Sequence, residues 1–528
     1  MSNSRYETLG ELLEASATDT PSAAYLVGDH LEVSFSDLQH RADAISKSLL
    51  GRGYRPGDRI AIAGTNRREW VEFFLGVTQV GMILVTLNVR YRRSELQYML
   101  SHSGARAVLT PAANQGFDLA ALYGDLAREL PELDEVFYFD PPEGTLGFDA
   151  LLRERDSIGD ELTQYRSEVG GDSPAIILFT SGTTGQPKGA TITHRSIIAS
   201  AQAQVDHFGT LPSDRMAGHM PFNHVGGITC TLVASLIARN TVVLMENFSP
   251  RGAIELINSQ HLTVFSGVPT MFVLIMADPT FANLDTSRIR QVIAGGSNVE
   301  PRLCEEIQRS FPNATLCNLY GLSETSGSCI ISPLDDTPEE ISSTLGTAIG
   351  EFRLRALGAD GPLAPGEEGE LQVFGDCVVA GYWNDPAETA KAISSDGWLS
   401  TGDMVTIAPD GHVTLKGRKK EMFIQGGYNV YPVEVENLLT SHPKVAMAAG
   451  IGITDPVLGE VGRYYVVARG AELPSVAELD EFCRARLADY KVPREYVFVS
   501  ELPLTPVGKI QKSILATSIK APVQKAQP

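Results

Sequence analysis

The chain alternates short apolar runs with stretches of helical periodicity from residue 6 to about residue 333. Runs such as residues 59–63, 175–179 and 242–244 are mostly apolar and only a few residues long, which predicts buried strands. Residues 301–310 instead place their apolar side chains at helical spacing. This alternation predicts an α/β fold whose layers contain mainly parallel sheets.

The pattern changes after about residue 346, where short β-like pieces alternate with turn signals. We expect a small β-barrel-like unit that closes the large domain. A charged segment at residues 416–421 follows, and beyond it lies a compact region that we expect to be a mobile α+β domain. We therefore predict an N-terminal domain over residues 1–419 and a C-terminal domain over residues 420–528. The turn signals lie at residues 358–361, 365–369 and 409–411.

Length and charge narrow the class of protein. A chain of 528 residues is too long for a single ordinary core, which agrees with more than one domain. Its 43 Lys and Arg residues stand against 64 Asp and Glu residues, giving a net charge of −21. Nucleic acid is therefore not expected as the main partner, because phosphate backbones attract basic surfaces. A local basic region for a nucleotide stays possible within this acidic chain.

Cysteine spacing and hydropathy favour an intracellular protein with reduced thiols. The six cysteines contain no C-x-x-C pair, so neither a zinc site nor a disulfide framework is indicated. We expect reduced thiols and a cytoplasmic location, because the polar N-terminus lacks the apolar stretch of a signal peptide. The most apolar long window, residues 70–89, contains Glu72, Thr78, Gln79 and Asn88. It fits a core helix followed by a strand better than a membrane span.

A segment rich in small and hydroxyl residues directly follows the apolar run at residues 175–179. It reads Thr-Ser-Gly-Thr-Thr-Gly-Gln-Pro-Lys-Gly. Glycines let backbone N–H groups approach an anion closely, the hydroxyls add neutral donors, and Lys188 adds a positive charge. The segment is not a Walker loop, because Pro187 precedes the lysine. A flexible Gly/Thr connection is the alternative, and the Pro-Lys-Gly ending favours a phosphate-binding loop.

Further motifs carry side chains that suit a nucleotide. In Asn-Leu-Tyr-Gly-Leu-Ser-Glu-Thr, Tyr320 offers a flat face for a base and Glu324 offers a hard oxygen ligand for Mg²⁺. Asp403 ends a Thr-Gly-Asp turn and can accept hydrogen bonds from both ribose hydroxyls. Arg418 follows a glycine, and Lys509 follows a Pro/Gly-rich stretch. Taken singly, each has an ordinary alternative, such as a surface glutamate or a solvated lysine.

Together and in this order, the motifs resemble the adenylate-forming superfamily, which contains acyl-CoA synthetases, adenylation domains and beetle luciferases. The resemblance covers residues 6–513. It implies two half-reactions. A carboxylate attacks the α-phosphorus of ATP to give an acyl-AMP and pyrophosphate, and a thiol then attacks the acyl carbon and releases AMP. Negative charge develops on the phosphates in the first step, so fixed cations and donors are expected to carry most of the catalysis.

The resemblance also implies a role for each matching residue. Lys509 would bridge the substrate carboxylate and the phosphate, and Glu324 would hold Mg²⁺. The glycine-rich loop would clasp the β- and γ-phosphates, the Thr-Gly-Asp and Gly-Arg motifs would hold the ribose, and adenine would lie between residues 296–297 and Tyr320. The expected nucleotide- and CoA-binding residues are Thr180, Ser181, Gly182, Thr183, Thr184, Gly185, Lys188, Gly296, Ser297, Asn318, Tyr320, Gly321, Ser323, Asp403, Arg418, Gly426 and Gly427.

Lys420 matches the hinge of this superfamily, about which the small domain swings so that one site serves both steps. In one pose Lys509 would face the nucleotide. In the other, the strand at residues 422–427 would face it, and its glycines would make room for the pantetheine arm. The sequence departs from the common pattern at three positions, with Lys in place of Asp at the hinge, Ser323 in place of Thr, and Tyr428 where Glu often follows the two glycines.

A Met-Pro-Phe-Asn-His-Val-Gly-Gly segment matches the superfamily's substrate-gating motif. The resemblance places Phe222 and His224 beside the acyl group, and a helix-capping or packed histidine is the alternative. Asn223 is uncharged where relatives that activate amino acids usually have Asp, which disfavours an amino acid. Small residues at Gly295 and Gly327 indicate a roomy apolar slot. We therefore expect a medium-chain fatty acid or a bulky ring-bearing acid, with an aryl acid as the competing substrate.

The expected reactants are a small carboxylic acid, ATP with Mg²⁺, and coenzyme A. CoA is favoured as the acceptor because no carrier domain follows the small domain in this sequence. An acyl-AMP ligase that loads a carrier protein is one alternative, although no obvious insertion would hinder domain rotation. A degenerate nucleotide-binding regulator is another, and intact Lys509, Glu324 and Asp403 argue against it. No stable membrane insertion is expected, and the sequence leaves the acid, the pathway and the oligomeric state open.

Overall fold

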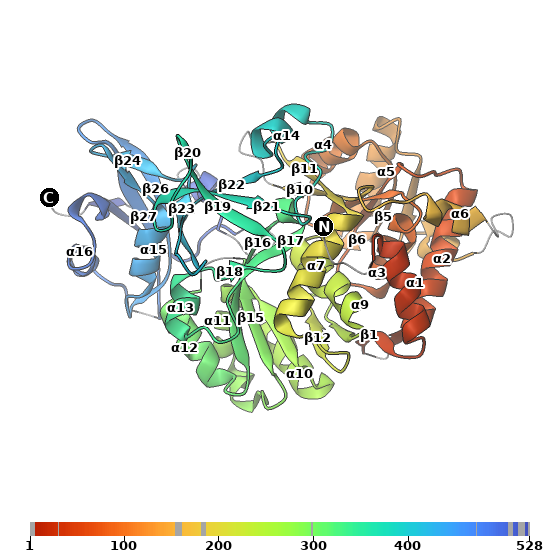
Figure 1. The fold of residues 1–528 in the computed structure, drawn as a ribbon, viewed down its shortest axis with the longest axis horizontal. Coiled ribbons are helices and arrows are strands. Elements are labelled where there is room, and N and C mark those ends of the chain that lie inside the picture. Colours follow the sequence, from red (N-terminus) through yellow and green to blue (C-terminus); the bar gives the residue numbers. More distant parts are fainter. Residues whose placement is uncertain are drawn as a thin grey trace.

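The computed structural model describes residues 6–29, 31–153, 161–180, 186–296, 299–470, 472–504, 510–515 and 523–525. Within these residues the chain forms four sheets of more than two strands, with helices packed against them (Figure 1). Three of these sheets precede residue 419, and the fourth lies in the C-terminal unit, which we define as residues 423–525. Figure 1 shows this unit at the opposite end of the molecule from α1 (Leu9–Asp19) and α2 (Phe35–Gly51).

A nine-stranded sheet forms the first large layer. Its six middle strands pair in parallel, whereas β17, β18 and β2 pair antiparallel at the edges. In sheet order the strands are β18 (Thr347–Ala348), β17 (Gly327–Ile331), β16 (Thr315–Leu322), β15 (Gln291–Gly295), β14 (Val264–Gly267), β12 (Arg215–Gly218), β13 (Thr241–Leu244), β1 (Ala24–Gly28) and β2 (Leu31–Ser34).

Helices cover this sheet with the apolar faces that their sequences provide. In α12 (Pro301–Ser310), Leu303, Cys304 and Ile307 are the buried positions, and they lie at helical spacing in one core with Val292 of β15. Burial of such a stripe is the main source of helix stability in a protein of this kind. The other helices between β10 and β19 are α7 (His194–Phe208), α8 (Val225–Gly227), α9 (Ala234–Ala238), α10 (Pro250–Gln260), α11 (Pro269–Ala277) and α13 (Pro338–Ser343).

A seven-stranded sheet forms the second layer, and its neighbouring strands pair in parallel except for β10 and β11, which pair antiparallel. Ile176 and Ile177 of β10 are both fully buried, which explains the continuous apolar run, because both faces of the strand are covered. In sheet order the strands are β11 (Lys188–Thr193), β10 (Pro174–Thr180), β4 (Ile83–Leu87), β3 (Arg59–Ala63), β5 (Ala105–Thr110), β8 (Glu135–Tyr138) and β9 (Leu146–Gly147). The accompanying helices are α3 (Arg68–Thr78), α4 (Arg93–Ser103), α5 (Leu119–Glu129) and α6 (Glu161–Ser167).

A five-stranded antiparallel sheet follows, as the turn-rich pattern after residue 346 predicts. Its strands are β20 (Gly361–Pro362), β19 (Arg353–Gly358), β21 (Glu368–Phe374), β22 (Leu399–Ile407) and β23 (Val413–Arg418), and α14 (Pro386–Ala392) lies between β21 and β22 in sequence. The C-terminal unit contains β24 (Phe423–Gln425), β25 (Tyr428–Val430), β26 (Val445–Asp455), β27 (Gly459–Ala468), β28 (Glu495–Val499) and β29 (Val523–Lys525), with α15 (Pro432–Thr440) and α16 (Val476–Arg484).

The structure confirms the predictions for the apolar window and for the cysteines, and it leaves the domain boundary untested. The apolar window at residues 70–89 is the core helix α3 followed by the buried strand β4. All six cysteines are unpaired thiols, and five of them are buried. In the part of the chain that the structure describes, no helix has both the length and the apolar character needed to cross a bilayer. The boundary at residues 419 and 420 stays a prediction.

Candidate active site

Three predicted nucleotide-binding residues, far apart in sequence, meet in one buried cluster. Asp403 of β22 and Arg418 of β23 are paired residues of the antiparallel hairpin, and the Arg418 Nε forms an ion pair with Asp403 Oδ1 at 2.7 Å. Tyr320 of β16 donates its hydroxyl to Asp403 Oδ2 at 2.6 Å. The five-stranded sheet thus places the Asp403 carboxylate against β16 of the nine-stranded sheet. Asp403 is 2% exposed at its side chain, whereas Arg418 is 39% exposed.

The electrostatics of this cluster keep each group in a defined charge state. Burial, together with the charge of Asp403, raises the pKa of Tyr320 well above its ordinary value, so the phenol stays protonated and donates. Burial is the largest single influence and lowers the pKa of the Arg418 guanidinium, but the charges of its acidic neighbours, with Asp403 first among them, together outweigh burial and raise that pKa. The carboxylate is thus held from two sides, while the outer part of Arg418 stays exposed.

A second cluster surrounds Glu324 and Lys188. Glu324 lies in η5 (Ser323–Thr325), directly after β16, and its Oε1 accepts a hydrogen bond from the Tyr382 hydroxyl at 2.9 Å. Lys188 begins β11 opposite Thr180 of β10, so both ends of the glycine-rich loop are fixed by strand pairing. Its ammonium group forms an ion pair with Glu388 and lies 5.0 Å from the centre of the Tyr382 ring. Tyr382 therefore contacts both Glu324, the predicted metal ligand, and Lys188, the cation predicted to bind phosphate.

Sequence reasoning missed Tyr382 and Glu388. The segment before α14 pairs with β11, since the Trp383 N–H donates to the Gly189 carbonyl at 2.7 Å and the Thr191 N–H donates to the Gly381 carbonyl at 2.9 Å. A Gly-Tyr-Trp-Asn-Asp-Pro stretch looks like an ordinary turn before a helix. No spacing signal in the chain connects it to a lysine about two hundred residues earlier.

Several of the predicted glycines allow strands to approach closely. A Cβ added to Gly321 would lie 2.1 Å from the Gly327 carbonyl oxygen, and one added to Gly295 would lie 2.6 Å from the Leu319 carbonyl oxygen. Gly327 has φ +149°, and an added Cβ would lie 2.6 Å from Ser200 Oγ. Gly296, directly after β15, has φ +80°, which favours glycine. The small residues at these positions are therefore required by the local backbone, whatever ligand they face.

Of the two residues predicted beside the acyl group, Phe222 is a core residue and His224 caps a helix. Phe222 is 1% exposed and packs against Trp70 in the main core, with ring centroids 5.6 Å apart. His224 is the N-cap of α8, and its Nδ1 accepts a hydrogen bond from the Gly226 N–H at 3.1 Å. The structure therefore gives the capping alternative a definite contact. Directly after α8 comes a π-helix, η3 (Ile228–Val233), which sequence periodicity did not indicate and which brings Thr229 next to Gly327.

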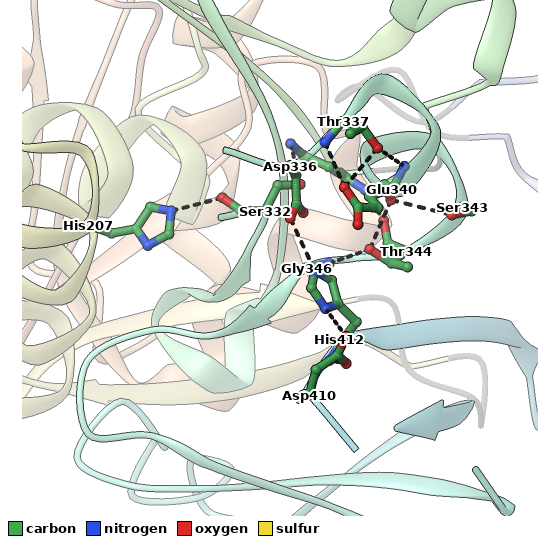
Figure 2. A network of polar contacts seen from close by, with 11 residues as sticks. His207, Ser332, Asp336, Thr337, Glu340, Ser343, Thr344, Gly346, Asp410 and His412 are labelled. Carbon is green, nitrogen blue, oxygen red and sulfur yellow. Dashed lines mark hydrogen bonds and ion pairs between the residues drawn. The ribbon is translucent and has the colours of Figure 1, made fainter. Parts of the chain in front are cut away.

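Asn318 belongs to a polar network behind β16. Its side-chain amide donates to the Thr344 carbonyl at 3.1 Å, and its backbone N–H donates to Ser332 Oγ at 3.0 Å. Figure 2 shows how this region continues, with His412 between Asp336 and Asp410 at the turn that joins β22 to β23. The two carboxylates raise the pKa of His412 against the opposing effect of burial. This network attaches one end of the β22–β23 hairpin to the large sheet, while its other end carries Asp403 and Arg418.

The predicted hinge and CoA-facing residues lie at the border of the C-terminal unit. Lys420 is exposed in a turn where the Glu421 and Met422 N–H groups both donate to the Arg418 carbonyl, at 3.0 and 3.1 Å. Gly426 and Gly427 are exposed in the tight turn between β24 and β25, with φ of +59° and +89°. The predicted residues Ser181, Gly182, Thr183, Thr184, Gly185, Ser297 and Lys509 lie outside the residues that the structure describes.

Comparison with known proteins decides the family. The model of the AMP-binding enzyme family matches residues 13–383, and the model of the AMP-binding enzyme C-terminal domain matches residues 434–509. The chain belongs to the AMP-binding enzyme family. The predicted membership of the adenylate-forming superfamily, in its acyl-CoA synthetase type, is thereby confirmed. The predicted α/β architecture is confirmed as well.

Relatives of this AMP-binding enzyme include ligases of two kinds of acid. It is 32% identical over 531 residues to the mitochondrial medium-chain acyl-CoA ligase of Macaca fascicularis, which covers 96% of this chain and 86% of the relative. It is 32% identical over 522 residues, with 96% and 98% coverage, to a Rhodococcus jostii (strain RHA1) CoA ligase named for a propanoyl group on a methyl-dioxo-octahydroindenyl ring system. The crystal structure of ATP-bound MatB from Rhodopseudomonas palustris superposes with a TM-score of 0.83 at 26% identity, over 96% of this chain and 98% of that one.

Proposed function

We propose that this AMP-binding enzyme is an ATP-dependent acyl-CoA ligase that activates a hydrophobic carboxylic acid as an acyl-AMP and transfers the acyl group to CoA. The observation that carries the proposal is the buried contact of Asp403 with Tyr320 and Arg418. It unites three of the motifs on which the family resemblance depends. A fixed carboxylate and a half-exposed guanidinium at a strand end suit a ribose and its phosphate.

The residues of the chain would act mainly through charge. In the first step the acid's carboxylate oxygen forms a bond to the α-phosphorus as the bond to pyrophosphate breaks. Lys188 would neutralise the terminal phosphates, and Lys509 would neutralise the charge that develops between acid and α-phosphate. In the second step the sulfur of CoA attacks the acyl carbon and AMP leaves. The same site can serve both steps if the C-terminal unit turns about Lys420.

A magnesium ion fits the donor set around Glu324. No group of three or more His, Cys, Asp or Glu side chains suited to a metal occurs in the described ranges. Mg²⁺ bound with nucleotides needs only one or two carboxylates, because phosphate oxygens and water fill its other positions. The Tyr382 hydroxyl orients the Glu324 carboxylate, which suits it to this task. The ion would supply charge neutralisation on the phosphates.

The acid is proposed to be a medium-chain fatty acid or a bulky ring-bearing acid. The relatives support this class, since one is named a medium-chain acyl-CoA ligase and another is named for a ring-bearing propanoyl group. An aryl acid is a second candidate, because a solved structure of an o-succinylbenzoate CoA synthetase matches 97% of this chain at 26% identity. A cytoplasmic location and the oligomeric state stay predictions from sequence.

A panel of free carboxylic acids with MgATP and CoA, scored by AMP release, tests the proposal. We expect release with medium-chain and ring-bearing acids and little with amino acids, because Asn223 offers no charge to an α-ammonium group. Lys509→Ala should lower acid-dependent ATP–pyrophosphate exchange about 10²- to 10³-fold, as for other lost oxyanion donors, yet spare CoA attack on presynthesised acyl-AMP. Transfer to a carrier protein but not to CoA would favour an acyl-AMP ligase. Absence of exchange with every acid would favour a regulator.

A further inference from the structure

Lys188 has a protein carboxylate as its partner at the position where the phosphates are proposed to bind. Its ammonium group forms an ion pair with Glu388, and the Tyr382 ring lies beneath it at 5.0 Å. The Lys188 side chain is 15% exposed and that of Glu388 is 17% exposed. Both side chains are therefore only partly exposed, and an ion pair in such a position is screened somewhat less than one on an open surface.

The backbone fixes this carboxylate within reach of Lys188. The segment that precedes α14 pairs with β11, including an isolated bridge between Tyr382 and Ala190. At the start of α14, the Glu388 N–H donates to Asp385 Oδ1 at 3.0 Å. Lys188 and Glu388 therefore stand on two segments that are joined by main-chain hydrogen bonds, and their contact does not depend on two freely moving surface side chains.

Glu388 carries its full negative charge at neutral pH. Hydrogen bonding to Lys188, and next to Lys391, lowers the pKa of its carboxyl to about 2. Lys391 contacts Glu388 Oε1 at 2.6 Å and is 72% exposed, whereas Lys188 occupies the other oxygen. An anion that reaches Lys188 must therefore exchange places with an ionised carboxylate.

We infer that Glu388 competes with the terminal phosphates of ATP for Lys188, and thereby sets the affinity for ATP without affecting the affinity for AMP. The inference rests on the proposed function, in which Lys188 contacts the β- and γ-phosphates. A phosphate group offers more charge and more acceptor oxygens than a carboxylate, so ATP displaces Glu388. AMP has no phosphate at this position and leaves the ion pair intact. Glu388 is a positioning residue, since it acts on the nucleotide through Lys188.

Equilibrium binding of MgATP and of AMP to the full chain tests this inference. Glu388→Gln keeps the shape of the side chain and removes the charge, so ATP should bind about two- to fivefold more tightly, the size expected for one partly exposed ion pair. The affinity for AMP should not change. Lys188→Met should weaken the binding of ATP and leave the affinity for AMP unchanged. In the Lys188→Met background, Glu388→Gln should have no further effect on the affinity for ATP. Glu434→Gln is the matched control, because Glu434 forms a comparable pair with Lys491 in the C-terminal unit, at 2.7 and 2.8 Å.

Each outcome of this cycle decides a separate point. If Glu388→Gln leaves ATP affinity unchanged or weaker while Lys188→Met weakens it, the competition is refuted and the phosphate role of Lys188 stands. If Glu388→Gln changes the affinities for ATP and AMP by the same factor, or lowers only the unfolding temperature, Glu388 has a structural role and the inference is overturned. If Lys188→Met leaves ATP binding unchanged, the proposed role of Lys188 fails, and the role of Glu388 fails with it.

Discussion

Two buried carboxylates, one in each part of the molecule, hold their cations differently. Asp403 in the large part is fixed by Tyr320 and Arg418, and Arg418 keeps 39% of its side chain exposed. Glu436 on α15 of the C-terminal unit pairs with Lys512 at 2.7 Å, and Lys512, only 17% exposed, contacts Glu421 at the same distance. Burial raises the pKa of Glu436 despite this cation.

The difference separates the proposed binding cluster around Asp403 from a structural cluster around Lys512. Arg418 has one buried partner and an exposed outer edge, so its remaining donors can serve a ligand. Lys512 stands between two carboxylates, and its charge is taken up inside the protein. Its position is still informative, because it connects η7 (Lys512–Ile514) to Glu421, the residue after the predicted hinge. Lys509 precedes Lys512 by three residues in the sequence.

The largest effect is expected from Lys512→Met in the structural cluster. Removal of the cation leaves two carboxylates facing each other, and breaking a buried pair typically costs about 3–5 kcal/mol. Hydrogen exchange of α15 should show this loss as easier local opening. Lys491→Met is the matched control, since Lys491 pairs with Glu434 on the same helix but at a more exposed position, and about 0–1 kcal/mol is expected there. Equal opening in both variants would remove the distinction between the two kinds of pair.

The next effect is expected from Asp403→Asn in the binding cluster. Arg418 and Tyr320 would lose a charged acceptor, and hydrogen bonds to charged groups contribute about 1.5–3 kcal/mol, or about 10- to 100-fold in kcat/KM for ATP. Acid-dependent ATP–pyrophosphate exchange at limiting ATP measures this change. Asp214→Asn is the matched control, because Asp214 is 2% exposed at its side chain and pairs with the partly exposed Arg290 away from the motifs. A similar fall in both variants would show that general stability, and not ribose binding, underlies the result.

The smallest effect concerns the contact between the two parts. Burial raises the pKa of Glu300, at the N-cap of α12, to about 7, while a hydrogen bond with Thr440 of α15 and the charge of Arg469 act in the opposite direction. The folded protein thus holds a proton that the unfolded chain, with a glutamate pKa of about 4.3, releases. The stabilisation is complete below about pH 4.3 and is lost as pH rises through about 7.

We therefore expect the unfolding temperature of the wild-type protein to fall relative to Glu300→Gln between pH 5 and pH 8. The difference should correspond to about 1 kcal/mol or less, since the side chain is only partly buried. Thermal unfolding of both proteins across this range measures it. A difference that stays constant with pH would show that Glu300 does not carry the proton.

Much of the fold and part of the site follow from local sequence. The continuous apolar run at residues 175–179 became β10, and the helical spacing at residues 301–310 became α12, because side-chain periodicity reports which faces are buried. Tyr320, Asp403 and Arg418 were found as motif residues, and the structure brings them into contact. Each of these predictions depends on residue types within a short stretch of chain.

Pairings between distant segments were decided only by the tertiary structure. The contact of Lys188 with Glu388 joins residues 200 positions apart, and that of Lys512 with Glu421 joins residues 91 positions apart. The π-helix beside Gly327 is likewise absent from the apolar pattern. Local periodicity determines which face of an element is buried, whereas the register of strands and the packing of layers determine which charges meet across it. For this reason the sequence by itself identified the family and its motif residues, and the folded chain alone showed which carboxylate holds each cation.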